Sequence, residues 1–157
     1  MTITSDGERL TGLWFDDQRP FDAAIQYACS EAKIPVFEQA IRWLDIYFSG
    51  QAPDFMPELK MISSPFRMMV WNILRTIPYG QTTTYGAIAQ IIAKQNTKMS
   101  AQAVGGAVAH NAFMLIIPCH RVLGSNGSLT GYAAGLERKR ALLSLEHAVY
   151  KDNRNGI

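Results

Sequence analysis

The sequence predicts a protein of the mixed α/β (α+β) class, with a small N-terminal sheet-plus-helix domain and a mainly helical C-terminal domain. Three observations lead to this prediction. The first 50 residues hold one weakly alternating segment and one segment with apolar side chains at helical spacing. A stretch of mixed polarity with two prolines follows. Several short helical segments that begin at serine or threonine come after it. We therefore expect one domain, with its linker, at residues 1–60 and another at residues 61–157.

In the N-terminal part, "RLTGLWF" (Arg9–Phe15) alternates as a strand does. "VFEQAIRWLDIYF" (Val36–Phe48) has helical spacing, and Gly50 suits its C-terminal stop. The proline-containing stretch Gln51–Ser64 is interpreted as a linker.

The C-terminal part should start with a helix at Ser64-Pro65, where a capping hydroxyl precedes a proline in the first turn. Pro78 should end this helix. A second helix follows a polar turn, and Thr83 or Thr84 should cap it. The apolar side chains of the first helix share one face: Phe66, Met69, Val70, Ile73, Leu74 and Ile77.

A third helix, capped by Ser100, is almost bare of side chains. Gly105 and Gly106 lie in its middle. Each lowers the stability of the helix by about 1 kcal/mol relative to alanine. Such a surface must lie very close to something, either another helix or a ligand. Together with the preceding helix it matches the helix-turn-helix outline, but it lacks the side chains that read base edges.

A wholly apolar segment, Phe113–Ile117, is expected to be a short buried strand that leads to Cys119. A glycine-rich loop (124–135) and a last amphipathic helix (136–148) complete the chain.

The segment "IPCHRV" places a thiol beside two basic side chains. A cysteine is only about 3% thiolate at neutral pH, so a nucleophilic cysteine needs a positive charge or a proton acceptor nearby. His120 can accept that proton if a turn follows Pro118 or if a water bridges the two groups. Either Glu137 or Glu146 in the last helix could stabilise the charged imidazole.

Asn111 could brace that turn through its amide. A buried structural cysteine beside an exposed histidine is the competing interpretation.

These motifs resemble one known family. "IPCHRV" with "GSLTGYAAGLERKRALLSLE" after it, and "TYGAIA" and "SAQAVGGAVAHN" before it, resemble the O6-alkylguanine-DNA alkyltransferases, or methylated-DNA–protein-cysteine methyltransferases. The resemblance extends from about Ser64 to His147. It implies a winged-helix-like helix-turn-helix that enters the minor groove of double-stranded DNA without sequence specificity. It also implies that a flipped-out O6-alkylguanine loses its alkyl group irreversibly to a cysteine, without a cofactor.

Carried over residue by residue, the resemblance makes Cys119 the alkyl acceptor, His120 its water-bridged base and Glu146 the carboxylate that polarises the imidazole. Asn111 becomes the hinge beside the recognition helix, and Tyr85 helps to rotate the nucleotide and to protonate the leaving guanine. The remaining assignments are a DNA-contact set and a base-pocket set. The first comprises Tyr85, Gly86, Ala101, Gln102, Ala103, Gly106, Arg121 and Ser125; the second comprises Pro118, Val122, Ser125 and Tyr132.

The chain departs from the family pattern at three places. Gln102 stands where an arginine commonly fills the gap left by the flipped base, and Ala112 replaces a proline after the asparagine. The N-terminal domain is expected to lack its first strand. We expect no zinc site, because Cys29 is the N-terminal domain's only cysteine and that domain has no histidine.

Composition limits the classes of protein to which this chain can belong. With 157 residues, 48% hydrophobic and 18% charged, the chain is globular, and its net charge of +2 permits nucleic-acid binding without indicating it. A signal pattern and an apolar run of membrane length are missing, so we expect a cytoplasmic protein. We also expect a monomer.

Three other functions compete with alkyl transfer. A sensor that binds alkylguanine without repairing it carries tryptophan at the cysteine position, which disfavours it here. A helix-turn-helix regulator and a cysteine hydrolase are the others.

Overall fold

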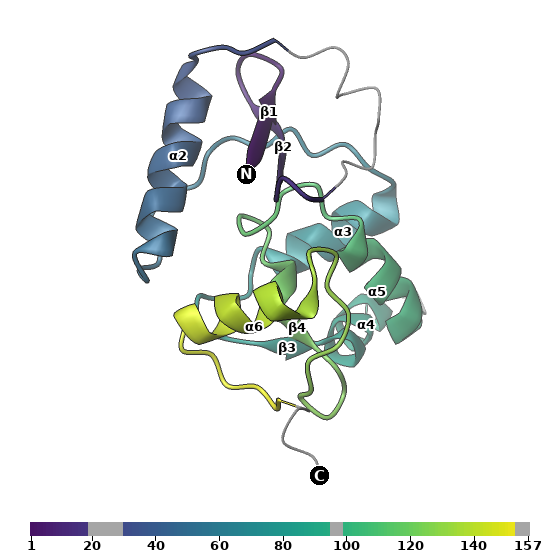
Figure 1. Ribbon diagram of the computed structural model, residues 1–157. Helices are drawn as coiled ribbons and strands as arrows, with labels where there is room; N and C mark the ends of the chain where they lie inside the picture. Colours follow the sequence, from purple (N-terminus) through teal and green to yellow (C-terminus); the bar gives the residue numbers. More distant parts are fainter. Residues whose placement is uncertain (19–29, 95–98, 153–157) are drawn as a thin grey trace. The chain divides into compact units, whose positions relative to one another are not determined.

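The computed structural model describes residues 1–18, 30–94 and 99–152, so Cys29 lies outside the described residues (Figure 1). Its helices and small sheets confirm the mixed α/β class. The chain divides into two compact units. One comprises Met1–Ile62 with Ala112–Ile116, and the other Ser63–Asn111 with Ile117–Ile157. The independent domains expected at 1–60 and 61–157 stay a prediction.

The first unit contains an antiparallel pair of strands, β1 (Thr2–Ser5) and β2 (Leu10–Trp14). The strand β2 confirms the one expected from alternation, and Leu10, Leu13 and Trp14 are buried. The strand β1 was not expected, since its sequence, "TITS", is short and mostly polar.

Helix α2 (Pro35–Phe48) confirms the expected helix and packs beside β1 (Figure 1). Its buried side chains recur at three- and four-residue spacing, as one apolar face requires: Val36, Ala40, Trp43 and Tyr47. The Trp43 and Tyr47 rings stack with their centroids 5.4 Å apart. Gly50, just beyond the helix, has a φ of 83°, which glycine adopts without strain.

The linker pairs with β2 instead of running free of the sheet. Leu10 N donates to Glu58 O at 2.8 Å, and Lys60 N donates to Leu10 O at 2.7 Å. These bonds satisfy part of the edge of β2 that does not face β1.

The strand expected at Phe113–Ile117 is wrong. This segment pairs with β2 only around Phe113, where Leu13 N donates to Ala112 O and Met114 N donates to Leu13 O. The chain then turns at Leu115, whose φ is 70°. The run is apolar because each of its residues is buried, and burial alone does not make a segment extended.

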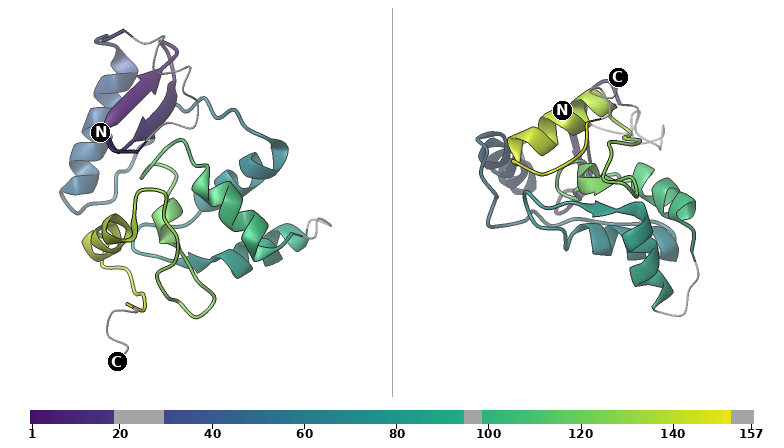
Figure 2. Two further views of the ribbon diagram at one scale, coloured as in Figure 1. Left: turned by 45° about the vertical axis from the view of Figure 1, so that its right-hand side comes forward. Right: turned by 90° about the horizontal axis from the view of Figure 1, so that it is seen from below.

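In the second unit, α3 (Pro65–Leu74), α4 (Tyr85–Ala93) and α5 (Ala101–Ala109) pack against one another (Figure 2). Their N-caps are as expected, with the hydroxyls of Ser64, Thr84 and Ser100 each accepting a backbone N–H. Thr84, not Thr83, is the cap of α4. Helix α3 ends at Leu74, earlier than Pro78 indicated, and single turns continue to the proline.

Three short elements complete this unit. The strand β3 (Thr83–Thr84) pairs in parallel with β4 (Val122–Leu123), and the 3₁₀ turn η1 (Cys119–Arg121) leads directly into β4. Helix α6 (Leu136–Leu145) follows Gly135, whose φ is 91°. Helices α4 and α5 occupy the expected helix-turn-helix positions, while the winged-helix likeness stays a prediction.

Gly12 should be essential to the first sheet, because a methyl group at this position would overlap the buried Trp14 ring. We expect Gly12→Ala to lower the free energy of unfolding by about 2 kcal/mol in urea titrations, as overpacking of a closed core does. The same change in a Trp14→Leu background should destabilise much less. An equal loss in both backgrounds would contradict the overlap.

Candidate active site

The 3₁₀ turn η1 begins at Cys119, so the turn after Pro118 on which contact with His120 was expected to depend is present. The thiol is only 2% exposed. Asn111 Nδ2 donates to Cys119 Sγ at 3.1 Å and to Ile117 O at 2.8 Å. One amide thus holds both the sulfur and the backbone that precedes it.

Burial raises the pKa of the Cys119 thiol, and the Asn111 hydrogen bond and the charge of Lys139 offset only part of this. The thiol at rest is therefore protonated. The two basic neighbours in the sequence do not reverse this, because both bind a carboxylate. Reaction at the sulfur consequently needs a proton acceptor.

That carboxylate belongs to Glu146, which is 2% exposed and lies at the C-terminal end of α6. His120 Nε2 lies 2.6 Å from Oε1. Arg121 donates to both oxygens, from Nε at 2.8 Å and from Nη2 at 3.0 Å. Gly80 N donates to Oε2 at 3.1 Å. Of the two candidate carboxylates, Glu146 therefore faces the histidine, whereas Glu137 is exposed and pairs with Arg140.

These contacts set the charges of the pair. Burial by itself raises the pKa of Glu146, but hydrogen bonds from His120 and Arg121 outweigh it and hold the pKa at about 2. Burial lowers the pKa of His120, and Glu146 offsets only part of that effect. A neutral imidazole beside a carboxylate donates from Nε2, which leaves Nδ1 as its basic nitrogen.

Arg121 is held by contacts within the second unit, and its expected contact with DNA stays a prediction. The residue is 8% exposed, its Nη1 donates to Ile77 O at 2.6 Å, and its guanidinium lies over the Tyr79 ring at 5.7 Å. Its described contacts are therefore to the protein, and above all to Glu146.

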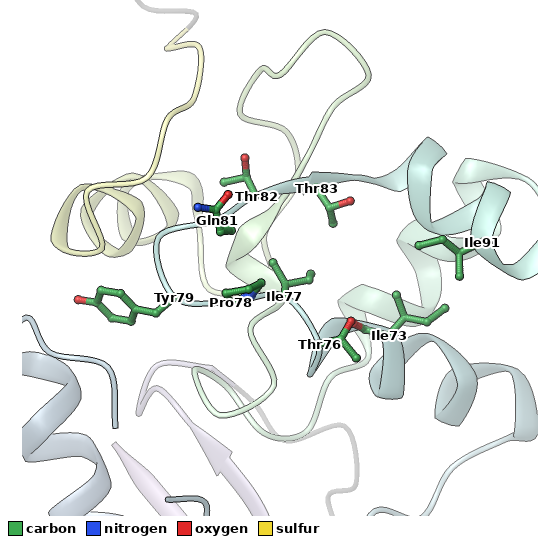
Figure 3. A pocket seen from close by; sticks show the side chains of 9 residues that line it. All are labelled: Ile73, Thr76, Ile77, Pro78, Tyr79, Gln81, Thr82, Thr83 and Ile91. Carbon is green, nitrogen blue, oxygen red and sulfur yellow. The ribbon is translucent and has the colours of Figure 1, made fainter. Parts of the chain in front are cut away.

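A surface pocket of about 620 Å³ opens on the loop that supports this charge cluster (Figure 3). Its lining includes Ile77, Tyr79 and Thr83 but none of the expected site residues. The loop matters to the site because Ile77 O and Gly80 N bind Arg121 and Glu146, respectively.

Tyr85 is the first residue of α4, and its hydroxyl donates to Gly131 O at 3.3 Å. Burial, followed by the charge of Cys119, raises the pKa of this hydroxyl, so it remains a proton donor. Of the expected base-pocket residues, Pro118 and Val122 are buried, Tyr132 is half-buried and Ser125 is exposed.

The bare helix α5 presents Ala101, Gln102 and Gly106 to solvent, while Ala103 and, on α4, Gly86 are half-buried. A methyl group at Gly105 would meet the Tyr85 ring at 3.8 Å. One at Gly106 would meet no atom of the described residues within 4 Å. Because 3.8 Å is an ordinary van der Waals contact, packing against the described residues requires glycine at neither position.

Sequence reasoning missed Lys139, a fully buried lysine on α6. A signal was present, since Lys139 shares three- and four-residue spacing with buried Leu142 and Leu143. A lysine on an apolar stripe indicates a buried ammonium group that has partners.

The chain resembles known proteins over the region that holds this site. Residues 65–148, more than half of the chain, match the family described as "6-O-methylguanine DNA methyltransferase, DNA binding domain". The chain belongs to this family. The matched range includes all the expected catalytic residues: Cys119, His120, Glu146, Asn111 and Tyr85.

Relatives extend the likeness to nearly the whole chain. The methylated-DNA–protein-cysteine methyltransferase of Mycobacterium tuberculosis is 47% identical over 93% of this chain and 85% of its own. That of Haemophilus influenzae is 39% identical over 97% and 83%. A crystal structure of Mycobacterium tuberculosis OGT in complex with DNA has a TM-score of 0.79 at 39% identity, covering 92% of this chain and 84% of that chain.

In the described parts of this family member, no three or more His, Cys, Asp or Glu side chains gather as a metal ion would require. No helix there has the length and apolar character needed to cross a bilayer.

The charge cluster predicts a pH dependence of stability. The pKa of Glu146 is about 2 in the folded protein against an ordinary 4.5. Its contribution is therefore fully present above about pH 4.5 and is lost as the pH falls toward 2. Glu146→Gln should lower the free energy of unfolding at pH 7 by about 3 kcal/mol, because it leaves Arg121 buried without its carboxylate.

Urea titrations at pH 7, 4 and 3 measure both effects. Wild type should lose stability over this range more steeply than Glu146→Gln. Glu137→Gln, which removes an exposed carboxylate of the same helix, should follow wild type. Parallel curves for wild type and Glu146→Gln would show that this carboxylate is not the group responsible.

Proposed function

We propose that this chain is a DNA repair protein that transfers an alkyl (methyl) group from O6-alkylguanine in DNA to Cys119, once per molecule. The observation that carries the proposal is the buried thiol, held by Asn111 and adjacent in η1 to the His120–Glu146 pair. Membership of a methyltransferase family, with relatives named for protein-cysteine methylation, supports it.

The reaction divides into steps with named groups. His120 Nδ1 accepts the thiol proton through one water, and the imidazolium that forms is stabilised by Glu146. The sulfur then bonds to the alkyl carbon while the bond from that carbon to guanine O6 breaks. The electron pair stays on the guanine, which takes a proton from the Tyr85 hydroxyl. The imidazolium of His120 then loses its proton and the Tyr85 phenolate regains one through solvent, so both groups return to their neutral forms. The products are unmodified guanine and an S-alkylcysteine, a thioether that nothing in this scheme cleaves.

The substrate must leave the base stack, because the alkyl carbon bonded to its O6 atom is out of reach inside a duplex. Helices α4 and α5 would face the minor groove, where small side chains permit close approach. Gln102 would fill the gap beside the orphaned base, and Asn111 would act as the hinge. The other groups proposed to contact DNA are Tyr85, Gly86, Ala101, Ala103, Gly106 and Ser125, and those proposed to line the base pocket are Pro118, Val122, Ser125 and Tyr132.

Arg121 is reassigned in this proposal. Its bonds to Glu146 and Ile77 O suit a group that fixes the carboxylate, not one that contacts phosphate. We further propose that the protein acts as a monomer in the cytoplasm, with the chromosomal DNA as its partner and without a cofactor.

A thiol at position 119 favours repair over the sensor alternative. Methylated duplex gives the direct test. We expect one equivalent of methyl group per protein from duplex DNA carrying labelled O6-methylguanine, found by peptide mass analysis on Cys119. Cys119→Ser should bind this duplex without accepting the group, as a sensor would. Label on Cys29, or continued turnover, would overturn the proposal and favour another chemistry.

The minor-groove interface predicts opposite effects on stability and binding at Gly106. Gly106→Ala should raise the free energy of unfolding by about 1 kcal/mol, since alanine favours the helix and meets open space. The added methyl should weaken binding to duplex DNA about tenfold, in fluorescence titrations at fixed salt, by holding α5 away from the groove.

Reaction with the free base O6-benzylguanine is the internal control for this variant, because no duplex needs opening. Its rate should stay within twofold of wild type. Unchanged duplex binding by a stabilised variant would remove Gly106 from the interface.

A further inference from the structure

Lys139 lies fully buried on α6, and its ammonium group is fully hydrogen-bonded. Nζ donates to Val122 O at 2.6 Å, to Thr130 O at 2.6 Å and to Gly131 O at 3.1 Å. A lysine has three N–H groups, so these carbonyls use all of them. They come from β4 and from the loop between β4 and α6, which the side chain therefore ties together.

Within the described residues Lys139 forms no ion pair with a carboxylate. This is unusual, because buried charges are ordinarily paired. The nearest buried carboxylate on the same helix, Glu146, already binds His120, Arg121 and Gly80 N. The hydrogen-bond partners of the ammonium group are these carbonyl oxygens, and burial lowers the pKa of Lys139 to about 8.

The groups that face this cation come from two other elements. On η1, Cys119 and His120 both feel its charge, which lowers the pKa of each. On α4, the Tyr85 ring has its centroid 5.9 Å from Nζ, and its hydroxyl shares Gly131 O with the lysine. Of these groups, Cys119 is the one that becomes the nucleophilic anion in the proposed reaction.

We propose that Lys139 is a positioning residue for alkyl transfer: it fixes Val122, Thr130 and Gly131 beside Tyr85 and supplies the positive charge opposite the Cys119 thiolate. The proposal deepens the function proposed above and rests on it. It completes the proton relay, because His120 and Glu146 remove the thiol proton whereas Lys139 stabilises the anion that remains.

The expected gain in rate is modest. Lowering the thiol pKa by one unit gives about ten times more thiolate at neutral pH, but each thiolate becomes about threefold less nucleophilic. The net acceleration is about threefold per unit. If Lys139 only held the loop in place, its replacement would change the geometry of the loop and leave the thiol pKa unchanged.

Thiolate absorbance at 240 nm, recorded against pH, separates these roles. The measurement uses the full chain with Cys29→Ser, so that Cys119 is its remaining thiol. Lys139→Met should raise the thiol pKa by at least one unit and slow alkylation by iodoacetamide about threefold at pH 7. Lys139→Arg, which keeps the charge, should restore most of the shift. The exposed Lys33→Met removes one charge elsewhere and should match wild type.

An unchanged thiol pKa in a folded Lys139→Met protein would overturn the proposal, whether or not its rate falls. Circular dichroism and thermal melting decide whether the variant is folded. These measurements need no DNA, so they remain valid if the methylated-duplex assay fails. Alkyl transfer by wild type together with an unchanged thiol pKa would refute only the role of Lys139.

If Lys139→Met does not fold, the wild-type side chain provides the test. With lysine labelled with ¹³C at Cε, NMR follows Lys139 before and after Cys119 is methylated by iodomethane in the Cys29→Ser protein. If the two groups are paired, the ammonium keeps its proton more strongly as Cys119 ionises at high pH. A methylated Cys119 cannot ionise, so the upper part of the lysine titration should move to lower pH. Identical titration before and after methylation would contradict the pairing.

Discussion

The Glu146 carboxylate is the constraint on which the site depends. A buried carboxylate is tolerated only when its oxygens are hydrogen-bonded, and here donors come from His120, Arg121 and Gly80. These donors belong to η1 and to the loop before β3, while Glu146 itself ends α6. One charge thus joins three separate segments of the second unit, and η1 carries Cys119 with it.

Reactivity follows from this arrangement more than from the basic residues beside the cysteine. Burial keeps the thiol protonated, and Arg121 is committed to the carboxylate. The thiol needs a base to remove its proton and a cation to stabilise the resulting anion. His120 suits the first requirement, since burial keeps its imidazole neutral. Lys139 suits the second, and its three carbonyl partners fix the loop around Tyr85.

Local chemistry made much of this predictable. Three helix starts could be predicted, at Ser64, at the Thr83–Thr84 pair and at Ser100, because hydroxyl capping depends on a few adjacent residues. The apolar run Phe113–Ile117 misled because a buried turn and a buried strand have the same composition. Lys139 was missed, and the ion pair of Arg121 was not foreseen, for a related reason: Val122 lies 17 residues from Lys139, and Glu146 lies 25 residues from Arg121. No local pattern reports a contact across such a separation.

The central claim is that burial keeps His120 neutral while Glu146 fixes the proton of its imidazole on Nε2, so that Nδ1 is the base. The ¹⁵N chemical shifts of the His120 ring, recorded from pH 5 to pH 8, test it most directly. At pH 7 the account predicts a neutral imidazole with its proton on Nε2, toward Glu146, and an unprotonated Nδ1. An imidazolium at pH 7, or a proton on Nδ1, would contradict it, because neither form can accept the thiol proton at that nitrogen.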